Sequence, residues 1–262
     1  MNKALPTLLA LLTATPTIQA AISYTLNGGV IATNFDALPT TGTNVVWAND
    51  STITGWNLFT KDSAAITAID AGTGSSTGGK FYSFGPTGDS DRALGGLASA
   101  GAYFGSPASG SVAGWIAVSV TNNTLTDLDV FTINYDGEQW RNGGNATAQT
   151  MVLEYGFGSS FSTVAAWTAP GTAFNFTSPI ATATAATLNG NDPANRAAGL
   201  GGSVSGLTWT PGSTLWVRWT ENNDAGNDHA LSIDNVSFSA VPEPSVVVLG
   251  LAAFMIPLRR KR

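Results

Sequence analysis

Short runs of alternating apolar and polar residues recur along the chain, and no long segment keeps the spacing of an amphipathic helix. The runs are rich in β-branched and aromatic residues, which is typical of strands. Clusters of Asn, Asp and Gly separate them. The strands predicted in this way cover residues 45–47, 53–59, 80–84, 115–121, 129–135, 150–157, 215–220 and 230–238. We therefore predict an all-β, antiparallel β-sandwich, most simply a jelly roll.

The turns are predicted from the same pattern. Turn residues occur at 122–123, 136–137, 142–144 and 222–224, and the glycine-rich stretches 72–79 and 95–110 indicate long surface loops. Residues 181–186 fit either a strand or a small helix. No internal repeat and no Pro- or Ser-rich linker divides the domain.

Alternation also predicts which side chains face the core, because successive strand residues point to opposite faces. The predicted core sets are Phe131, Ile133 and Tyr135; Ile116, Val118 and Val120; Leu215, Val217 and Trp219; and Met151, Leu153, Tyr155 and Phe157. Trp216, Arg218 and Glu154 then lie on the opposite face. Since an unpaired guanidinium in mid-strand is costly, we expect Arg218 to join a charged cluster with Glu154, extending to Glu138 and Arg141.

The N-terminal residues 1–20 have the layout of a secretory signal peptide. Lys3 precedes an apolar stretch over 4–12, and a small-residue segment ends at Ala20, where we expect cleavage after export by the Sec machinery. A retained N-terminal anchor is the alternative, although the stretch is short for a membrane span.

The C-terminal residues 241–262 combine three elements in a fixed order. Pro242, Glu243 and Pro244 are followed by an apolar run over 245–258, and the chain ends with Arg259, Arg260, Lys261 and Arg262. Positive charge stays on the cytoplasmic side of an inserted helix, so the order predicts a single membrane helix with the domain outside. As a helix, the apolar run is only about 21 Å long, whereas the hydrocarbon core of a bilayer is roughly 30 Å thick. The alternative is a hydrophobic C-terminal strand with a basic end.

This tail resembles the PEP-CTERM sorting signal of exopolysaccharide-producing Gram-negative bacteria. The resemblance implies export, retention in the inner membrane by the C-terminal helix, and cleavage near the motif by an exosortase. It implies a final place at the cell surface or in the extracellular matrix.

The remaining residues, 22–239, are enough for one β domain. Of the 11 Lys and Arg residues, five lie outside this range, which leaves six against 16 of the 17 acidic residues and a formal charge of −10. Such a surface repels phosphate backbones, so we expect no nucleic-acid partner. The chain has no cysteine, and the exported domain must therefore be stable without disulfides.

Two internal segments carry a second resemblance. Residues 137–144 (GEQWRNGG) and 216–235 (WVRWTENNDAGNDHALSIDN), together with 34–36 and 91–95, are similar to a module found alone in PEP-CTERM proteins and also attached to secreted bacterial nucleases or phosphatases. The resemblance implies no enzymatic activity for the module itself.

The residue inventory also argues against catalysis. His229 is the only histidine and cysteine is absent, which nearly excludes Ser-His-Asp, Cys-His and His-rich metal chemistry. Glycoside hydrolysis needs only two carboxyls, and the pairs Asp136 with Glu138 and Glu154 with Glu221 are the candidates. We expect a non-enzymatic domain, and a glycoside hydrolase is the third alternative, after a glycan-binding module and a structural matrix protein.

Oxygen-rich segments suggest calcium. Asp224 and Asp228 lie with Asn222, Asn223 and Asn227 in a glycine-containing loop whose hard oxygen ligands suit Ca²⁺. A solvated turn explains the same composition without metal. Asp36 on the first strand and Asp234 on the last form a second candidate, because the carbohydrate-binding jelly rolls that this chain resembles in architecture fasten their terminal strands with structural calcium there.

Tryptophans beside charged residues suggest a glycan ligand. We expect a ligand face formed by Glu138, Trp140, Arg141, Glu154, Trp216 and Arg218, in which indole rings stack on sugar rings of a polysaccharide. The alternative for Trp140 and for Trp216 is that the side chain is buried in the core of the sandwich and contacts no ligand. The function predicted is a matrix-associated, glycan-binding module, and the rival is a purely structural or adhesive matrix protein without a defined ligand.

Overall fold

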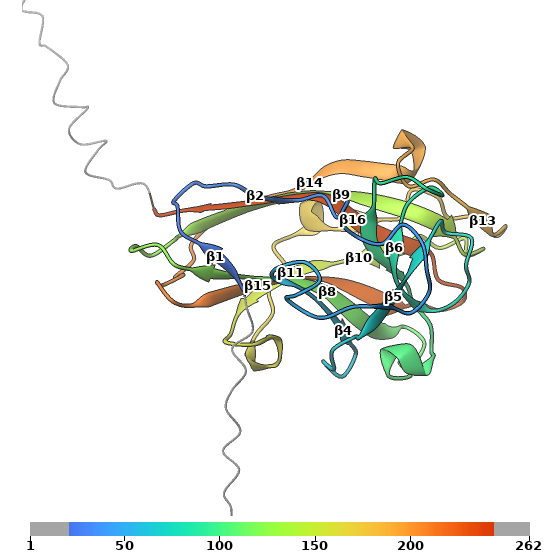
Figure 1. The fold of residues 1–262 in the computed structure, drawn as a ribbon, viewed down its shortest axis with the longest axis horizontal. Coiled ribbons are helices and arrows are strands. Elements are labelled where there is room, and N and C mark those ends of the chain that lie inside the picture. Colours follow the sequence, from blue (N-terminus) through green and yellow to red (C-terminus); the bar gives the residue numbers. More distant parts are fainter. Residues whose placement is uncertain (1–20, 244–262) are drawn as a thin grey trace, which may run out of the picture.

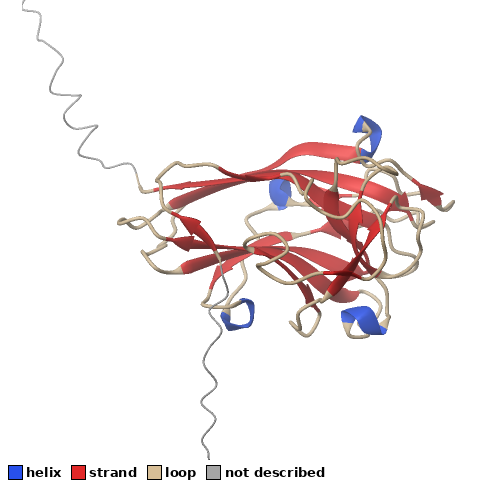
Figure 2. Ribbon diagram, viewed as in Figure 1, coloured by secondary structure: helices blue, strands red, loops and turns tan. Residues whose placement is uncertain are grey.

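The chain folds into two facing β-sheets (Figure 1), and the apolar side chains buried between them form the core. The computed structural model describes residues 21–243, which form strands and loops with short 3₁₀ turns (Figure 2). The turns are η1 (Ala102–Phe104), η2 (Phe161–Thr163), η3 (Thr172–Phe174) and η4 (Pro193–Asn195). The prediction of an all-β sandwich is confirmed, and the finer assignment as a jelly roll stays a prediction. The predicted signal peptide, Pro244, the membrane helix and the basic tail lie outside the described residues.

One sheet has five strands. Its members are β1 (Ile22–Tyr24), β4 (Trp56–Thr60), β8 (Ser111–Asn122), β11 (Leu153–Phe157) and β15 (Thr214–Asn223). The order is β1-β8-β15-β11, and β4 also pairs with β8. The pairing of β1 with β8 is parallel, as is that of β5 with β6 in the other sheet, so the sandwich is not antiparallel throughout.

The second sheet has nine strands. They are β2 (Ile31–Thr33), β3 (Val45–Val46), β5 (Ala68–Gly72), β6 (Lys80–Phe84), β7 (Ala93–Leu97), β9 (Val130–Asn142), β13 (Ala186–Thr187), β14 (Arg196–Val204) and β16 (Ala230–Val241). A separate two-stranded sheet pairs β10 (Thr150–Met151) with β12 (Phe176–Thr177).

The core faces follow the predicted alternation. The inward sets of β8, β9 and β15 are all buried between the sheets: Ile116, Val118, Val120, Phe131, Ile133, Tyr135, Leu215, Val217 and Trp219. Met151 and Leu153 are also buried, whereas Tyr155 and Phe157 are only partly covered and pack against the same core. Period-two patterning was therefore sufficient to orient the central strands.

The predicted turn at Asp136-Gly137 is wrong, because both residues lie inside β9. A Cβ atom on Gly137 would come within 2.2 Å of the Phe176 ring, so the glycine leaves space for an aromatic side chain. The nearby irregularity is in the partner strand, where the register shifts between Asp234 and Ser237.

The predicted loop over 95–110 begins too early, because residues 93–97 form β7. Gly95 and Gly96 are needed in this buried strand, since Cβ atoms there would lie 2.3 Å from the Leu231 carbonyl oxygen and 2.8 Å from the Glu221 carboxyl carbon. Strands β14 and β5 are rich in Gly and Ala, which have low β-propensity, and β1 and β2 have only 3 residues each, so none of the four was predicted.

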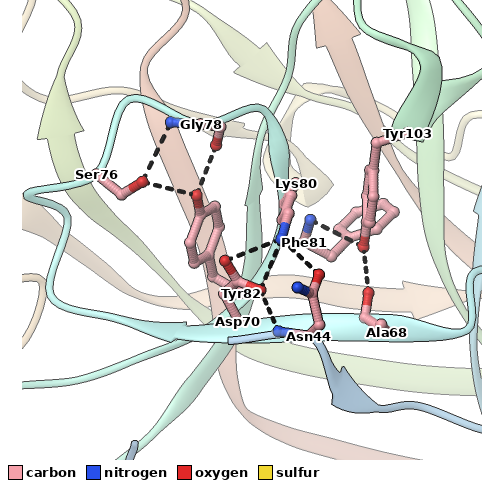
Figure 3. A network of polar contacts seen from close by, with 9 residues as sticks. All are labelled: Asn44, Ala68, Asp70, Ser76, Gly78, Lys80, Phe81, Tyr82 and Tyr103. Carbon is pink, nitrogen blue, oxygen red and sulfur yellow. Dashed lines mark hydrogen bonds and ion pairs between the residues drawn. The ribbon is translucent and has the colours of Figure 1, made fainter. Parts of the chain in front are cut away.

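A polar network fastens the edge of the nine-stranded sheet (Figure 3). Lys80 Nζ lies 2.9 Å from Asp70 Oδ1 and donates to Asn44 Oδ1 at 2.8 Å, while the Asn44 backbone N–H donates to the same Asp70 oxygen. Nearby, the Tyr103 hydroxyl donates to the Ala68 carbonyl oxygen. These contacts hold β5 against β6 with side chains as well as the backbone ladder.

Candidate functional site

The ion pair predicted between Arg218 and Glu154 is confirmed on the outer face of the five-stranded sheet. The two residues are directly opposite each other in the β11·β15 ladder. Arg218 Nη2 lies 2.7 Å from Glu154 Oε2, and Nε donates to the same oxygen at 2.8 Å. Burial lowers the pKa of the Arg218 guanidinium, while the hydrogen bond and charge of Glu154 oppose that shift.

Aromatic rings cover this outer face, and Trp216 lies beneath them. Its side chain is 1% exposed, and its Nε1 donates to the Gly158 carbonyl oxygen at 3.0 Å. The Phe161 ring, carried by the η2 turn, packs edge-on to Trp216 and stacks on Phe59 with a centroid distance of 4.0 Å. The expectation that Trp216 presents its ring to a ligand is therefore wrong, because the loop after β11 folds over it.

Two other tryptophans, rather than Trp216, are partly exposed beside Arg218. Trp115 on β8 and Trp167 in the loop after η2 are only partly buried. The Arg218 guanidinium carbon lies 3.9 Å from the centroid of the Trp167 ring and 4.7 Å from that of Trp115, within cation–π range of both. We call Trp115, Trp167, Arg218 and Glu154 the outer-face platform.

Sequence reasoning missed both of these tryptophans. Trp115 is directly opposite Thr220 in the β8·β15 ladder, two residues along from Arg218, and that register was not readable beforehand. Trp167 lies outside the regular strands, where no alternation pattern applies.

The other residues of the predicted ligand face lie on the opposite sheet. Glu138 and Trp140 are both 1% exposed on β9, and Trp140 Nε1 donates to Glu138 Oε2 at 3.1 Å. The Phe84 ring stacks on Trp140, and a Cβ atom on Gly190 would touch the same indole. The single six-residue face and the extension of the Arg218 cluster to Glu138 and Arg141 are therefore wrong.

Glu138 is in an acidic neighbourhood at the junction of β9 and β16. Burial raises the pKa of Glu138 to about 7, against the hydrogen bond from Trp140. Burial likewise raises the pKa of Asp234 to about 8, with Glu138, Asp91 and Asp36 adding repulsion. The structure thus brings the predicted calcium pair, Asp36 and Asp234, into one electrostatic neighbourhood.

The fit of this neighbourhood to calcium rests on one observation. Asp234 is 2% exposed, and its Oδ1 has no hydrogen-bond partner among residues 21–243. A buried carboxylate oxygen of this kind suits a hard cation. Asp36, by contrast, accepts hydrogen bonds from the Asn34 side chain and the Arg92 backbone N–H. Within the described part of the chain, no three His, Cys, Asp or Glu side chains are arranged to hold one metal ion.

The second predicted calcium segment forms the rim of an open cavity. Asp224 and Asp228 lie in the loop between β15 and β16, and Asp228 Oδ1 accepts a hydrogen bond from the Asp224 backbone N–H at 2.7 Å. This bond joins the Asp224 backbone to a side chain four residues later, so it closes the loop without metal but is not an Asx-turn, in which the side chain accepts from the N–H two residues further on. Arg141 lines the same cavity, whereas Arg218 belongs to the other sheet.

The carboxylate pairs suggested for glycoside hydrolysis differ in their geometry. Glu154 lies on the outer face of its sheet, whereas Glu221 is 4% exposed, on the inward side of β15, against Gly96. These two cannot flank one bond. Asp136 and Glu138 share a face of β9, but Asp136 accepts hydrogen bonds from the Gly199 N–H and the Asn235 side chain.

Only the beginning of the predicted sorting motif belongs to the described residues. Pro242 and Glu243 follow the last residue of β16, and Pro244 comes directly after them in the sequence. Among residues 21–243, no helix has the length and hydropathy needed to cross a membrane.

No family model and no curated protein matches the chain. Among solved structures, it is similar to the CBM22-1 xylan-binding domain of Paenibacillus barcinonensis Xyn10C, with a TM-score of 0.38 and 9% identity over 83% of this chain and 98% of that chain. It is also similar to an arabinose-bound α-L-arabinofuranosidase, MgGH51 (TM-score 0.36, 10% identity, 87% of this chain and 31% of that one). A third similar structure is the isomalto-dextranase of Arthrobacter globiformis T6 in complex with panose, with a TM-score of 0.31 and 14% identity over 84% of this chain and 33% of that chain. The chain spans about a third of each enzyme, and at these TM-scores none of the three indicates a ligand or an activity for it.

Proposed function

We propose that the domain is a non-enzymatic, glycan-binding β-sandwich that works at the cell surface or in the extracellular polysaccharide matrix. The observation that carries this proposal is the outer-face platform, in which the partly buried rings of Trp115 and Trp167 both lie within cation–π range of an ion-paired guanidinium. Partly exposed indole rings provide flat apolar area beside hydrogen-bonding groups, which is what a sugar ring needs.

The chemistry of the platform favours a neutral or weakly charged sugar. Glu154 balances the charge of Arg218, so the platform has little net charge of its own. Nη1 of Arg218 has no hydrogen-bond partner among residues 21–243 and is free to donate to a hydroxyl group. Stacking supplies most of the attraction, and Arg218 with Glu154 supplies orientation.

The sequence of the two ends supports the proposed delivery to the matrix. The proposal is that the Sec machinery exports the chain, that the C-terminal helix holds it in the inner membrane, and that an exosortase cleaves near Pro242, Glu243 and Pro244. A structural calcium ion at Asp234 and Asp36, within a jelly-roll topology, belongs to the same proposal.

The test of glycan binding is a polysaccharide array probed with the full chain in mild detergent. We expect saturable binding to at least one neutral polysaccharide, and a Trp167→Ala variant that binds at least about tenfold more weakly, since stacked rings are dominant contributors to recognition. Leu125→Ala is the matched control, because Leu125 is exposed and apolar on the β8–β9 loop. Equal binding by Trp167→Ala and the parent chain, or no saturable binding at all, would favour the structural matrix protein instead.

A further inference from the structure

An open cavity of about 560 Å³ lies at one end of the sandwich. Val130 pairs with Val241 at one end of β9, where the chain leaves toward residue 244, whereas Arg141 pairs with Ala230 at the other end. The cavity is at the Arg141 end. It is lined by the loop after β7, the loop between β15 and β16, and the residues that follow β9.

The local sequence builds this cavity through close backbone approaches. A Cβ atom on Gly143 would lie 2.0 Å from the Asp228 carbonyl oxygen, so only glycine allows the two loops to meet. The Gly143 N–H donates to Nδ1 of His229 at 2.9 Å, which ties the loop after β9 to the start of β16. The wall of the cavity is therefore preformed.

Two acidic side chains, Asp224 and Asp228, and one basic side chain, Arg141, line the cavity. Neither carboxylate forms an ion pair with a residue in the described range 21–243. Glu221 lies behind them, with a pKa raised well above its usual value by burial first and then by repulsion from Asp228 and Asp224. Burial also raises the pKa of Asp228 to about 7. A positive charge placed in the cavity would relieve this repulsion.

Neutral oxygen acceptors accompany the carboxylates. Asn223 lines the cavity and is 6% exposed; its Nδ2 donates to the Pro107 carbonyl oxygen, while its Oδ1 has no partner among the described residues. Ser99 and Ser109 add hydroxyl groups to the lining. The basic side chain at the cavity, Arg141, donates from Nη1 to the Gly74 carbonyl oxygen.

We infer that this cavity is a second ligand site, which binds an amino sugar that carries a free ammonium group. The ammonium has three donors for the Asp224 and Asp228 carboxylates, and the ring hydroxyls match the Asn223 and Ser109 oxygens. The volume suits one sugar residue at the end of a chain or branch. A neutral sugar would leave the carboxylates repelling each other, and an acidic sugar would add to the repulsion.

This inference deepens the proposed glycan binding but does not depend on the outer-face platform. The experiment measures binding of a glucosamine oligosaccharide to the full chain by calorimetry at 0.15 M salt, with the fully N-acetylated oligosaccharide as the uncharged comparison. At this ionic strength, charges separated by more than about 8 Å are largely screened, so the general acidity of the domain contributes little. We expect the glucosamine oligosaccharide to bind at least about tenfold more tightly than its acetylated form.

Two variants locate the site. Asp224→Asn removes one charge from a carboxylate that accepts no hydrogen bond from the rest of residues 21–243, and Asp228→Asn keeps an oxygen for the Asp224 N–H. Each should weaken glucosamine binding at least about tenfold without lowering the melting temperature. Asp127→Asn is the control, because Asp127 is exposed on the β8–β9 loop at the other end.

Each remaining outcome would overturn the inference. Equal affinity for the two oligosaccharides would show that the ammonium group is not recognised. Equal weakening by Asp127→Asn would show attraction to the whole acidic domain. Competition by millimolar Ca²⁺ that abolishes binding in full, with the metal alone bound stoichiometrically at Asp224 and Asp228, would make the cavity a cation site. The Trp167→Ala variant should bind the glucosamine oligosaccharide as tightly as the parent chain does. Loss of binding at the cavity and loss of binding at the outer-face platform can therefore be distinguished.

Discussion

Glu138 makes the stability of the domain depend on pH. It is 1% exposed, and burial raises its pKa from 4.5 to about 7. A carboxyl whose pKa is higher in the folded than in the unfolded state holds its proton longer when folded. The contribution of Glu138 to stability is therefore greatest below the unfolded-state pKa, falls as pH rises from about 4.5 to about 7, and is constant above that range.

The magnitude follows from the size of the shift. The rise in the pKa of Glu138 from 4.5 to about 7, at about 1.4 kcal/mol for each pH unit, corresponds to roughly 3–4 kcal/mol lost across the window. In a domain of this size, 1 kcal/mol moves the melting temperature by about 2–4 °C, so roughly 6–16 °C is expected from Glu138 alone.

The perturbation is Glu138→Gln, which keeps an oxygen acceptor for Trp140 Nε1 and removes the titration. Melting temperatures of the full chain and the variant are compared from pH 4 to pH 9 by circular dichroism. The variant should match the parent at pH 4 and exceed it above pH 7. Asp127→Asn, at an exposed position, should follow the parent curve throughout. Parallel curves for Glu138→Gln and the parent would refute the argument, because they would mean that the buried carboxyl does not titrate in this window.

Three further predictions concern the ion pair, the metal and the tail. Arg218→Ala should lower the free energy of unfolding by about 2 kcal/mol, measured by urea titration, because it removes the Glu154 ion pair and the cation–π contacts with Trp167, Trp115 and Phe161. A loss no larger than that of Lys61→Ala, which pairs with Asp62 at the surface, would contradict it. Calcium at about 100 times its dissociation constant should add about 2.7 kcal/mol and raise the melting temperature, an effect that Asp234→Asn reduces; identical melting in calcium and in chelator would exclude the site. Replacement of the four basic residues 259–262 with neutral residues should release the chain from the membrane fraction. Replacement of Pro242, Glu243 and Pro244 with Ala should leave the chain in the membrane fraction without cleavage. Mature protein of unchanged mass from this second variant would contradict sorting at this motif.

The sequence by itself determined the central strands and their inward faces. Phe131, Ile133 and Tyr135 alternate with polar residues on β9, and this period is a local property that burial against one sheet enforces. The same reasoning placed Arg218 and Glu154 on the outer face, and the energetic cost of an unpaired guanidinium then predicted their contact.

Only the tertiary structure decided which outward-facing residues reach solvent. Trp216 and Trp140 point away from the core as alternation requires, yet Phe161 covers one and the loop at Gly190 covers the other. The path of a loop depends on contacts far apart in the sequence, so no local pattern could show that Trp115 and Trp167 would be the partly exposed rings.

Tertiary structure also decided the protonation behaviour of the carboxylates. Asp136, Glu138, Glu154 and Glu221 look alike in the sequence. Their environments differ because one pairs with Arg218, two are sealed from water, and one accepts hydrogen bonds near the surface. The pKa of a carboxyl depends on desolvation and on charges brought near by folding, and both are fixed only when the sheets and their covering loops have packed.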